Sequence, residues 1–447
     1  MSVSSRSLLR GFATSARRSH SPLTITSPHP VFIKSVCEGQ IPAFRLLGAD
    51  GQVSENVGEE WKNRIKEVDG QKLQRMLEVM TRLPILDQIL YSSQRQGRIS
   101  FYMTSYGEEG AVVGSAAAWE NTDEVFAQYR EVGVLLWRDY PLSSLMAQVF
   151  SSASDTATLG RQMPVHYGSK EHHFHTISSP LGTQLPQAAG AAYALKRTPG
   201  REKDCVICYA GEGATSEGDF HAGLNMASVL GGPLVFFIRN NGFAISTPVS
   251  QQYAGDGVAA RGPGYGIPTL RLDGNDPLAV YLGCKEARRL AVETQKPVLV
   301  EAMSYRVSHH STSDDSSAYR STDDVNRMKL DSAGGRLRKY LEGLVVGEGE
   351  GAVPLWSVEK ENQIKDQSKK AILKEFGKAE KEKKPKLEEM FGDVFARRLG
   401  HEEGELERPQ REQKEELRRL VEKWGGTEGW KKELDKFEGG REAVLKW

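Results

Sequence analysis

Short apolar runs alternate with stretches of helical periodicity through the middle of the chain. Runs rich in Val, Ile, Leu and Phe are typical of strands that are buried on both faces. The clearest are CVICYA (205–210), PLVFFIR (233–239), IPTLRLD (267–273) and PVLVEAMSYR (297–306). Helical stretches such as LPQAAGAAYALKR (185–197) lie between them. Because parallel strands need crossover connections, the pattern predicts an α/β fold with a mostly parallel sheet flanked by helices.

Other segments extend this pattern toward the N-terminus. FYMTSYGEEGAVVGSAAAW (101–119) predicts a short strand, a turn and an Ala-rich helix, and VGVLLWRD (132–139) predicts another strand. From 36 to 84 the chain is polar and mixed, which predicts an N-terminal arm that enters a helix at Gln71–Arg82. We therefore expect the α/β domain to span 85–332.

The two ends of the chain differ from this central domain. Residues 1–35 are rich in Ser and Arg, and no acidic residue precedes Glu38. This composition is typical of a mitochondrial import sequence, and a disordered basic tail is the alternative. We therefore predict import into the mitochondrial matrix. From 333 to 447 charged residues are frequent, which predicts a C-terminal helical region that exposes most of its surface to water.

The charge balance and the cysteines exclude some classes of function. The chain has 59 Lys plus Arg and 59 Asp plus Glu, so its net charge indicates neither nucleic acid nor an acidic membrane as a partner. Its apolar stretches are far shorter than the roughly 20 residues that cross a bilayer. Cys205 and Cys208 form a CxxC pair inside an apolar run, and no second pair accompanies it. We therefore expect buried packing instead of redox or zinc chemistry.

Polar residues follow two of the predicted strands at their carboxyl ends. CVICYA leads into Gly211-Glu212-Gly213, and PLVFFIR ends at Asn240-Asn241. In a right-handed βαβ unit both strand ends lie at the same edge of the sheet, where open α/β sheets bind ligands. We therefore expect Glu212 and Asn241 to lie close together.

This expected pair has the chemistry of a magnesium site. Carboxylate and amide oxygens suit magnesium, and such sites usually add phosphate oxygens and water. A helix that begins just after Gly213 adds N–H groups for a diphosphate. A single Gly-x-Gly also occurs in plain turns, whereas polar residues at the ends of two strands are more specific. The pattern predicts a site for magnesium and a diphosphate.

The same region resembles a known family. GEG…NN is similar to the thiamine diphosphate motif, usually GDG…NN, with Glu212 in place of Asp. Longer stretches resemble the alpha subunits of thiamine diphosphate-dependent branched-chain 2-oxo acid dehydrogenases. These stretches are FYMTSYGEEG, GRQMPVHYGSKE, RNNGFAISTP, ARGPGYGIP, LDGNDPLAVY and HHSTSDDSSAYRS. The resemblance is close over 85–330 and loose after it, and it implies the thiamine diphosphate-binding fold.

The resemblance also implies roles for individual residues. The implied cofactor contacts are Tyr129, Arg130, Ser179, Leu181, Gly211, Glu212, Gly213, Ala214, Arg239, Asn241 and His310. The implied magnesium ligands are Glu212, Asn241 and the backbone carbonyl of Phe243, where the family commonly has Tyr. The implied ligands of a structural potassium ion are Ser178, Pro180, Thr183 and Gln184. His310 and Gln128 are the implied catalytic residues, and Ser311 and Ser321, in a regulatory loop at 309–321, are implied phosphorylation sites.

Some of these residues also have plainer interpretations. Taken alone, Arg130 is more typical of a surface ion pair than of a phosphate-binding residue. The loop 309–321 has few apolar groups, so its composition predicts a mobile, solvated segment. The cluster His172, His173 and His175 looks like a metal site, but we expect a solvated or packed loop.

A reaction and a set of partners follow from the resemblance. The implied reaction is decarboxylation of a branched-chain 2-oxo acid on thiamine diphosphate, with transfer of the acyl group to a lipoyl-bearing transacylase core. In this superfamily a second α/β domain supplies the glutamate that activates the cofactor, and no such domain fits between 333 and 447. A separate beta subunit in an α2β2 heterotetramer is therefore implied, as are a regulatory kinase and phosphatase. A pyruvate dehydrogenase-type alpha subunit and a non-catalytic regulatory subunit are the alternatives.

Overall fold

The computed structural model describes residues 40–347, 353–392 and 407–447. The chain divides into two units, Met1–Gly39 and Gln40–Trp447, and the described residues belong to the second. The predicted import sequence at 1–35 lies outside the described residues, so it stays a prediction.

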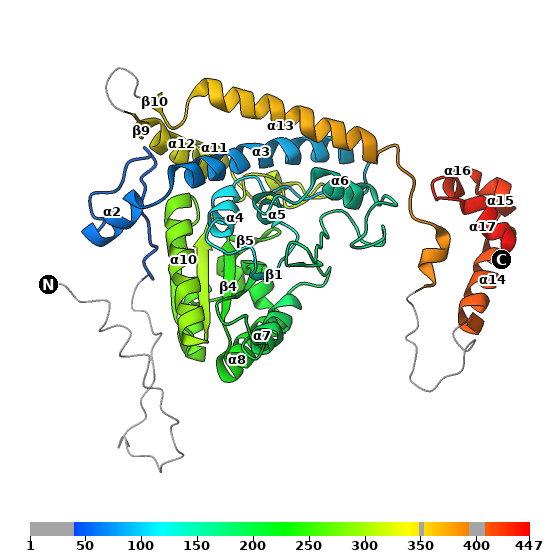
Figure 1. Cartoon of the computed structure of the whole chain (residues 1–447), viewed down its shortest axis with the longest axis horizontal. Helices are drawn as coiled ribbons and strands as arrows, with labels where there is room; N and C mark the ends of the chain where they lie inside the picture. Colours follow the sequence, from blue (N-terminus) through cyan, green and yellow to red (C-terminus); the bar gives the residue numbers. More distant parts are fainter. Residues whose placement is uncertain (1–39, 348–352, 393–406) are drawn as a thin grey trace, which may run out of the picture. The chain divides into compact units, whose positions relative to one another are not determined.

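A six-stranded sheet forms the centre of the fold (Figure 1). Its strand order is β2-β1-β3-β4-β8-β7, and every adjacent pair is parallel. The strands are β1 (Glu124–Phe126), β2 (Phe174–His175), β3 (Val206–Gly211), β4 (Leu234–Asn240), β7 (Thr269–Asp273) and β8 (Pro297–Met303). The parallel α/β fold and the four strands predicted from the clearest apolar runs are therefore confirmed.

The central strand β3 packs against apolar side chains on both faces of the sheet. Successive side chains of a strand point to opposite faces. Cys205 and Ile207 accordingly lie in one core cluster, whereas Val206 and Cys208 lie in another. Helices that contribute to the first cluster include α3 (Gly70–Arg95), α4 (Glu109–Ala116) and α10 (Pro277–Thr294), and those that contribute to the second include α7 (Gln184–Leu195) and α8 (Gly218–Leu230). Both cysteines are fully buried, which confirms the expected packing role.

The other elements connect or extend these layers. Within 40–332 they are α2 (Glu59–Lys66), α5 (Val132–Trp137), α6 (Leu142–Phe150), η1 (Glu212–Ser216), β5 (Phe243–Ala244), β6 (Thr247–Pro248), α9 (Val249–Gln252), η2 (Ala259–Tyr265), η3 (Ser316–Ala318) and α11 (Thr322–Leu330). Toward the C-terminus they are α12 (Ala333–Gly343), β9 (Val345–Val346), β10 (Val353–Pro354), α13 (Val358–Ala379), η5 (Leu387–Met390), α14 (Glu407–Lys423), α15 (Gly426–Gly429), α16 (Lys431–Leu434) and α17 (Gly440–Lys446). No helix in the described part of the chain is long and apolar enough to cross a membrane.

Two of the predicted strands are wrong. The run 132–139 contains helix α5, and every residue of α5 is buried. Residues 101–105 belong to neither a strand nor a helix. A short apolar run that is buried on all sides suits a helix as well as a strand, so hydrophobic periodicity does not distinguish the two.

The helix predicted at Gln71–Arg82 is longer than expected. α3 continues through Pro84 and ends at Arg95. Proline removes one backbone hydrogen bond from a helix, but the buried side chains of α3 pack into the main core and offset that loss. The domain boundary expected at 84 therefore falls inside one continuous helix.

Candidate functional site

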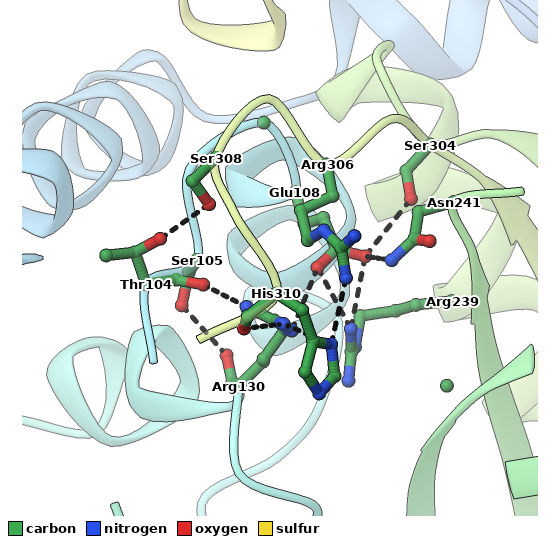
Figure 2. A network of polar contacts seen from close by, with 12 residues as sticks. Thr104, Ser105, Glu108, Arg130, Arg239, Asn241, Ser304, Arg306, Ser308 and His310 are labelled. Carbon is green, nitrogen blue, oxygen red and sulfur yellow. Dashed lines mark hydrogen bonds and ion pairs between the residues drawn. The ribbon is translucent and has the colours of Figure 1, made fainter. Parts of the chain in front are cut away.

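Several of the predicted site residues contact Glu108, which the sequence pattern did not single out. Glu108 precedes α4 and is fully buried. Its carboxylate accepts hydrogen bonds from Arg239 (3.1 and 3.2 Å) and from Nδ2 of Asn241 (3.1 Å). Figure 2 shows these side chains converging from separate elements. Burial by itself would raise the pKa of Glu108, but the charges of Arg239 and Arg130 hold it below its usual value. Glu108 is therefore a buried carboxylate paired with cations.

Two buried arginines of the site are each held by several groups. Arg239 donates from Nε to Glu131 at 2.6 Å, so two carboxylates flank its guanidinium group. Arg130 donates to the carbonyl oxygens of Thr104 and His310, and its Nε lies 3.6 Å from Glu108. The exposed fraction is 2% for Arg130 and 1% for Arg239. Guanidinium groups fixed in this way are suited to binding an anion such as a diphosphate.

The ends of β3 and β4 meet at one edge of the sheet. Gly213 lies so close to Ala244 that a Cβ on Gly213 would come within 2.8 Å of the Ala244 Cβ. Gly211 and Arg239 are paired in the sheet, so Glu212 and Asn241 follow neighbouring strand ends. Asn241 donates a hydrogen bond to Glu108, and Glu108 lies near enough to Glu212 for its charge to raise the pKa of Glu212. The structure therefore brings Glu212 and Asn241 to the same edge, as the strand-end pattern predicted.

The carboxyl group of Glu212 contains an oxygen atom that the described residues leave without a hydrogen bond of ordinary geometry. Its Oε1 is buried and has no hydrogen-bond partner among the described residues. Burial, followed by the nearby charge of Glu108, raises the pKa of Glu212 to about 7. Asn241 donates its amide N–H to Glu108 and turns its oxygen toward the Phe243 N–H at 3.2 Å. The oxygens of these residues fit a divalent cation, which would remove the unfavourable burial of an unpaired carboxylate oxygen.

The helix expected directly after Gly213 is different in the structure. Glu212–Ser216 forms the 3-10 helix η1, and α8 begins only at Gly218. Ala214 is buried within η1. The N–H groups nearest the end of β3 therefore belong to a short, tight turn, which contributes less aligned dipole than the first turn of a long α-helix.

His310 lies at the site on the segment that follows β8. Its Nδ1 is 2.9 Å from Arg306 and 3.3 Å from Arg130, and its ring meets the edge of Tyr129 at 6.0 Å between centroids. Because both arginines only donate, Nδ1 carries the lone pair and Nε2 carries the proton. Burial and the two adjacent cations lower the pKa of His310 to about 3. The ring is therefore neutral at physiological pH, with Nε2–H free to donate.

Gln128 is engaged at the end of β3. Its side-chain Oε1 accepts the Gly211 N–H at 2.7 Å, and its backbone N–H donates to the Glu131 carboxylate at 2.8 Å. Glu131 also accepts from Arg239. One short segment therefore supplies three contacts of the site. Gln128 contacts the end of β3, Tyr129 contacts the His310 ring, and Arg130 contacts the His310 carbonyl oxygen.

The loop 309–321 has a defined conformation, whereas its composition predicted a mobile one. Asp314 accepts the His310 N–H at 2.7 Å and the Tyr319 hydroxyl at 2.6 Å. Arg320 is buried and donates to the carbonyl oxygens of Arg306 and Ser308. Buried polar pairing therefore anchors this loop in place of the apolar contacts that its sequence lacks.

Three of the residues predicted to bind potassium lie on the loop between β2 and α7, and the fourth, Gln184, is the first residue of α7. The Thr183 hydroxyl is 3.3 Å from the Ser178 hydroxyl and 3.3 Å from the Pro180 carbonyl oxygen. Gln184 donates its Nε2 to the Tyr209 carbonyl at 3.0 Å and is buried. The structure thus gathers oxygens from three of the four predicted ligands, with Gln184 next to them in the chain.

Ser179 and Leu181, two predicted cofactor contacts, are exposed on the same loop. No hydrogen bond among the described residues joins either of them to the network around Glu108. Conversely, Glu108, Glu131 and Arg306 complete that network although the sequence reading missed them. Their signal was a charged residue beside an apolar run, which often requires a buried partner.

The three neighbouring histidines are bonded to protein groups. His173 and His175 contact Glu124 at 3.0 and 3.2 Å, and His172 contacts Ser169 at 2.7 Å. Within the described ranges no three His, Cys, Asp or Glu side chains are arranged to hold a metal ion.

Two further buried carboxyl groups lie near the site. Asp87 accepts the Tyr102 hydroxyl at 2.8 Å and the Ser105 N–H at 2.6 Å, and burial raises its pKa to about 7. Glu109 accepts the Gly107 N–H at 2.9 Å, and burial raises its pKa from 4.5 to about 8. Both groups therefore keep their protons in the folded chain at pH values where the unfolded chain has lost them.

We expect Glu109→Gln to weaken the pH dependence of stability. Between the unfolded pKa of 4.5 and the folded pKa of about 8, rising pH favours the unfolded chain, because only that chain releases the proton. The free energy of unfolding then falls by about 1.4 kcal/mol per pH unit for one proton. Glutamine does not ionise, so the free energy of unfolding of the variant should rise relative to that of the wild type as the pH approaches 8. Thermal unfolding from pH 5 to pH 9 measures this, with exposed Glu217→Gln as control, and parallel curves would contradict it.

Comparison with known proteins places this geometry in a family. The chain matches the family described as Dehydrogenase E1 component over residues 77–388, which include every residue of the Glu108 network. It is 52% identical over 395 residues to "2-oxoisovalerate dehydrogenase subunit alpha, mitochondrial" of Homo sapiens, covering 88% of this chain and 83% of that protein. It is 45% identical over 365 residues to "2-oxoisovalerate dehydrogenase subunit alpha 1, mitochondrial" of Arabidopsis thaliana, covering 81% and 74%. The chain therefore belongs to the Dehydrogenase E1 component family.

Proposed function

We propose that this chain is the alpha subunit of the decarboxylating component of a branched-chain 2-oxo acid dehydrogenase complex. It converts branched-chain 2-oxo acids to carbon dioxide and an acyl group on a lipoyl carrier. The names of its relatives support the substrate class. The observation that carries the proposal is the meeting of Glu212, Asn241 and two buried arginines at the carboxyl edge of the sheet. The mitochondrial relatives and the predicted import sequence support a location in the matrix.

We assign thiamine diphosphate and magnesium to this edge. Glu212, Asn241 and the Phe243 carbonyl hold the metal, and the unpaired Oε1 of Glu212 supports that assignment. Arg130 and Arg239 attract the diphosphate. When bound, thiamine diphosphate supplies the nucleophile and electron sink that decarboxylation requires.

The chain's own residues hold the cofactor in place. Glu108 orients Asn241 and the arginines in advance, so little reorganisation accompanies binding. Arg306 fixes the tautomer of His310, which then donates from Nε2 beside the cofactor without adding a charge.

A beta subunit completes the proposed active site in an α2β2 assembly. Alone, with thiamine diphosphate and magnesium, the chain should show no decarboxylation, because the described residues supply diphosphate and metal contacts without the second α/β domain. Co-expressed with a beta partner, it should turn over 3-methyl-2-oxobutanoate with a kcat/KM at least about tenfold above that for pyruvate, since missing methyl groups in an apolar pocket cost roughly that factor.

Each other outcome identifies an alternative. Turnover by the isolated chain would contradict the two-subunit arrangement. A preference for pyruvate would indicate a pyruvate dehydrogenase-type alpha subunit, and no turnover with any beta partner would indicate a non-catalytic regulatory subunit. The intact set of Arg130, Glu212, Asn241 and His310 favours the catalytic role.

We propose a potassium ion on the loop 178–184, supported by the three oxygens that meet around Thr183. Potassium should raise the melting temperature and the cofactor affinity more than sodium does. A ligand specific to the folded state adds about 2.7 kcal/mol at a concentration 100 times its Kd. Thr183→Val keeps the shape without the hydroxyl and should abolish the difference between the salts. An equal response of the wild type to both salts would remove the site.

We also propose that a kinase and a phosphatase act on the loop 309–321. Ser311 is half-buried, and its hydroxyl accepts the Ser313 N–H at 3.2 Å. Ser321 is exposed and caps α11 by accepting the Asp324 N–H at 3.1 Å. We infer that phosphorylation of the half-buried Ser311 has the regulatory effect and that the exposed Ser321 has a minor role.

A further inference from the structure

A hydrogen bond of 2.8 Å joins the ring of His166 to the hydroxyl of Ser179. His166 is 5% exposed, whereas Ser179 lies on the exposed loop 178–181. On the other side of the ring, Nδ1 faces the carbonyl oxygens of Met163 at 3.0 Å and Pro164 at 3.1 Å. Carbonyl oxygens only accept, so in the neutral ring Nδ1 carries the proton and Nε2 accepts from Ser179. The ring therefore links a buried loop to an exposed one.

This bond lies at the open end of a short antiparallel pairing. The Ile177 N–H donates to the Tyr167 carbonyl at 3.0 Å. Beyond Ile177, no backbone N–H of 178–181 donates a hydrogen bond among the described residues. The other contacts of this loop are the two from the Thr183 hydroxyl, each 3.3 Å long. The hydrogen bond between Ser179 and His166 is therefore the shortest of those that hold the loop among the described residues.

The backbone just before His166 is strained. Val165 has a φ of 70° and is 1% exposed. A β-branched residue in this left-handed region persists only where the surrounding packing imposes it, and such positions gather at functional sites. Here the unusual turn precedes a buried side chain that bonds the exposed hydroxyl of Ser179.

We infer that His166 is a positioning residue for the cofactor-binding loop. The inference rests on the proposed function, in which Ser179 and Leu181 contact thiamine diphosphate. By accepting a hydrogen bond from the Ser179 hydroxyl, His166 fixes the rotamer of Ser179 and leaves the lone pairs of the hydroxyl oxygen available. It also keeps 178–181 in one conformation, so less ordering accompanies cofactor binding.

Two substitutions separate the two sides of the ring. His166→Asn places an amide near the Nδ1 position, keeps a donor for the buried carbonyls and loses the contact with Ser179. His166→Gln places an amide oxygen near the Nε2 position and keeps an acceptor for the hydroxyl. In the assembled alpha–beta enzyme, calorimetry should show that His166→Asn weakens thiamine diphosphate binding about three- to tenfold, the effect of one net hydrogen bond. His166→Gln should stay closer to the wild type.

A double-mutant cycle tests the coupling directly. Ser179→Ala should weaken binding as much as His166→Asn, and the double variant should be no weaker than the poorer single variant, because both remove the same contact. Additive losses would overturn the inference. Equal losses in His166→Asn and His166→Gln would also overturn it, since they would assign the ring to fold stability alone.

Glu212→Gln distinguishes this inference from the function on which it rests. If Glu212→Gln weakens cofactor binding and His166→Asn does not, His166 has no positioning role. If neither substitution changes the affinity, the proposed cofactor site itself is wrong.

Discussion

Replacing Glu212 by Gln is expected to weaken the binding of thiamine diphosphate and magnesium by about 100-fold or more. Loss of a residue that only supports a metal ligand typically weakens binding by about 10- to 100-fold, and a direct ligand should matter at least as much. Glutamine keeps the size of the side chain but removes the negative charge that a hard divalent cation prefers. Calorimetric titration of the cofactor-free alpha–beta enzyme measures the change.

The fold itself should tolerate this substitution. Among the described residues no hydrogen bond of ordinary geometry reaches the buried Oε1 of Glu212, and Glu108 carries a like charge nearby, so a neutral amide removes an unfavourable burial. The melting temperature of the cofactor-free enzyme should therefore stay the same or rise. Glu217→Gln makes the same charge change at an exposed position beside α8 and should leave the affinity unaltered. Unchanged affinity in Glu212→Gln would remove the magnesium assignment.

Ser311→Glu is expected to reduce overall dehydrogenase activity with the lipoyl-bearing partner by at least about tenfold, which corresponds to 1.4 kcal/mol. The half-buried Ser311 hydroxyl accepts the Ser313 N–H, and a longer, charged side chain displaces that contact. The new carboxylate also lies close to Asp314, which accepts from His310 and Tyr319. Repulsion between the two carboxylates should release His310 from its hydrogen bond with Asp314, and in the proposed site this would hinder the lipoyl carrier.

Ser321→Glu is the matched control for this prediction. Ser321 is exposed at the N-terminus of α11, where the helix dipole favours a negative charge. Its hydroxyl bonds Asp324 on α11, and no hydrogen bond among the described residues joins it to His310. The activity of the Ser321→Glu enzyme should stay close to that of the wild type. Ser311→Gln, assayed at several ionic strengths, separates bulk from charge, because exposed charge effects weaken with salt. Full activity of Ser311→Glu with the lipoyl-bearing partner would leave the regulatory role of this loop unsupported.

The apolar runs by themselves determined four of the six strands of the sheet, β3, β4, β7 and β8, whereas the short strands β1 and β2 were not predicted. β3 and β4 are buried on both faces, so nearly every position must be apolar, and that requirement is visible in five consecutive apolar residues of each strand, Val206–Ala210 and Leu234–Ile238. The handedness of βαβ connections then placed Glu212 and Asn241 at one edge without any knowledge of the packing. Where burial surrounds a helix instead, as in α5, the same apolar signal no longer distinguishes helix from strand.

The composition of the loop 309–321 predicted mobility, and only the tertiary structure assigned it a conformation. Apolar residues are scarce there, and the anchors are buried bonds from Arg320 to backbone carbonyl oxygens. Composition reports how much apolar surface a segment can bury, but it does not report whether a buried arginine meets suitable acceptors.

The long motifs determined most of the candidate site residues, whereas their connection through Glu108 became visible only in the fold. Glu108 and its partner Arg239 are 131 positions apart, and Arg130 reaches His310 across 180 positions. A charged residue beside an apolar run indicates that a buried partner must exist, because an unpaired buried charge is strongly unfavourable. The sequence does not say which distant element supplies that partner, since the choice depends on how helices and strands pack around the sheet.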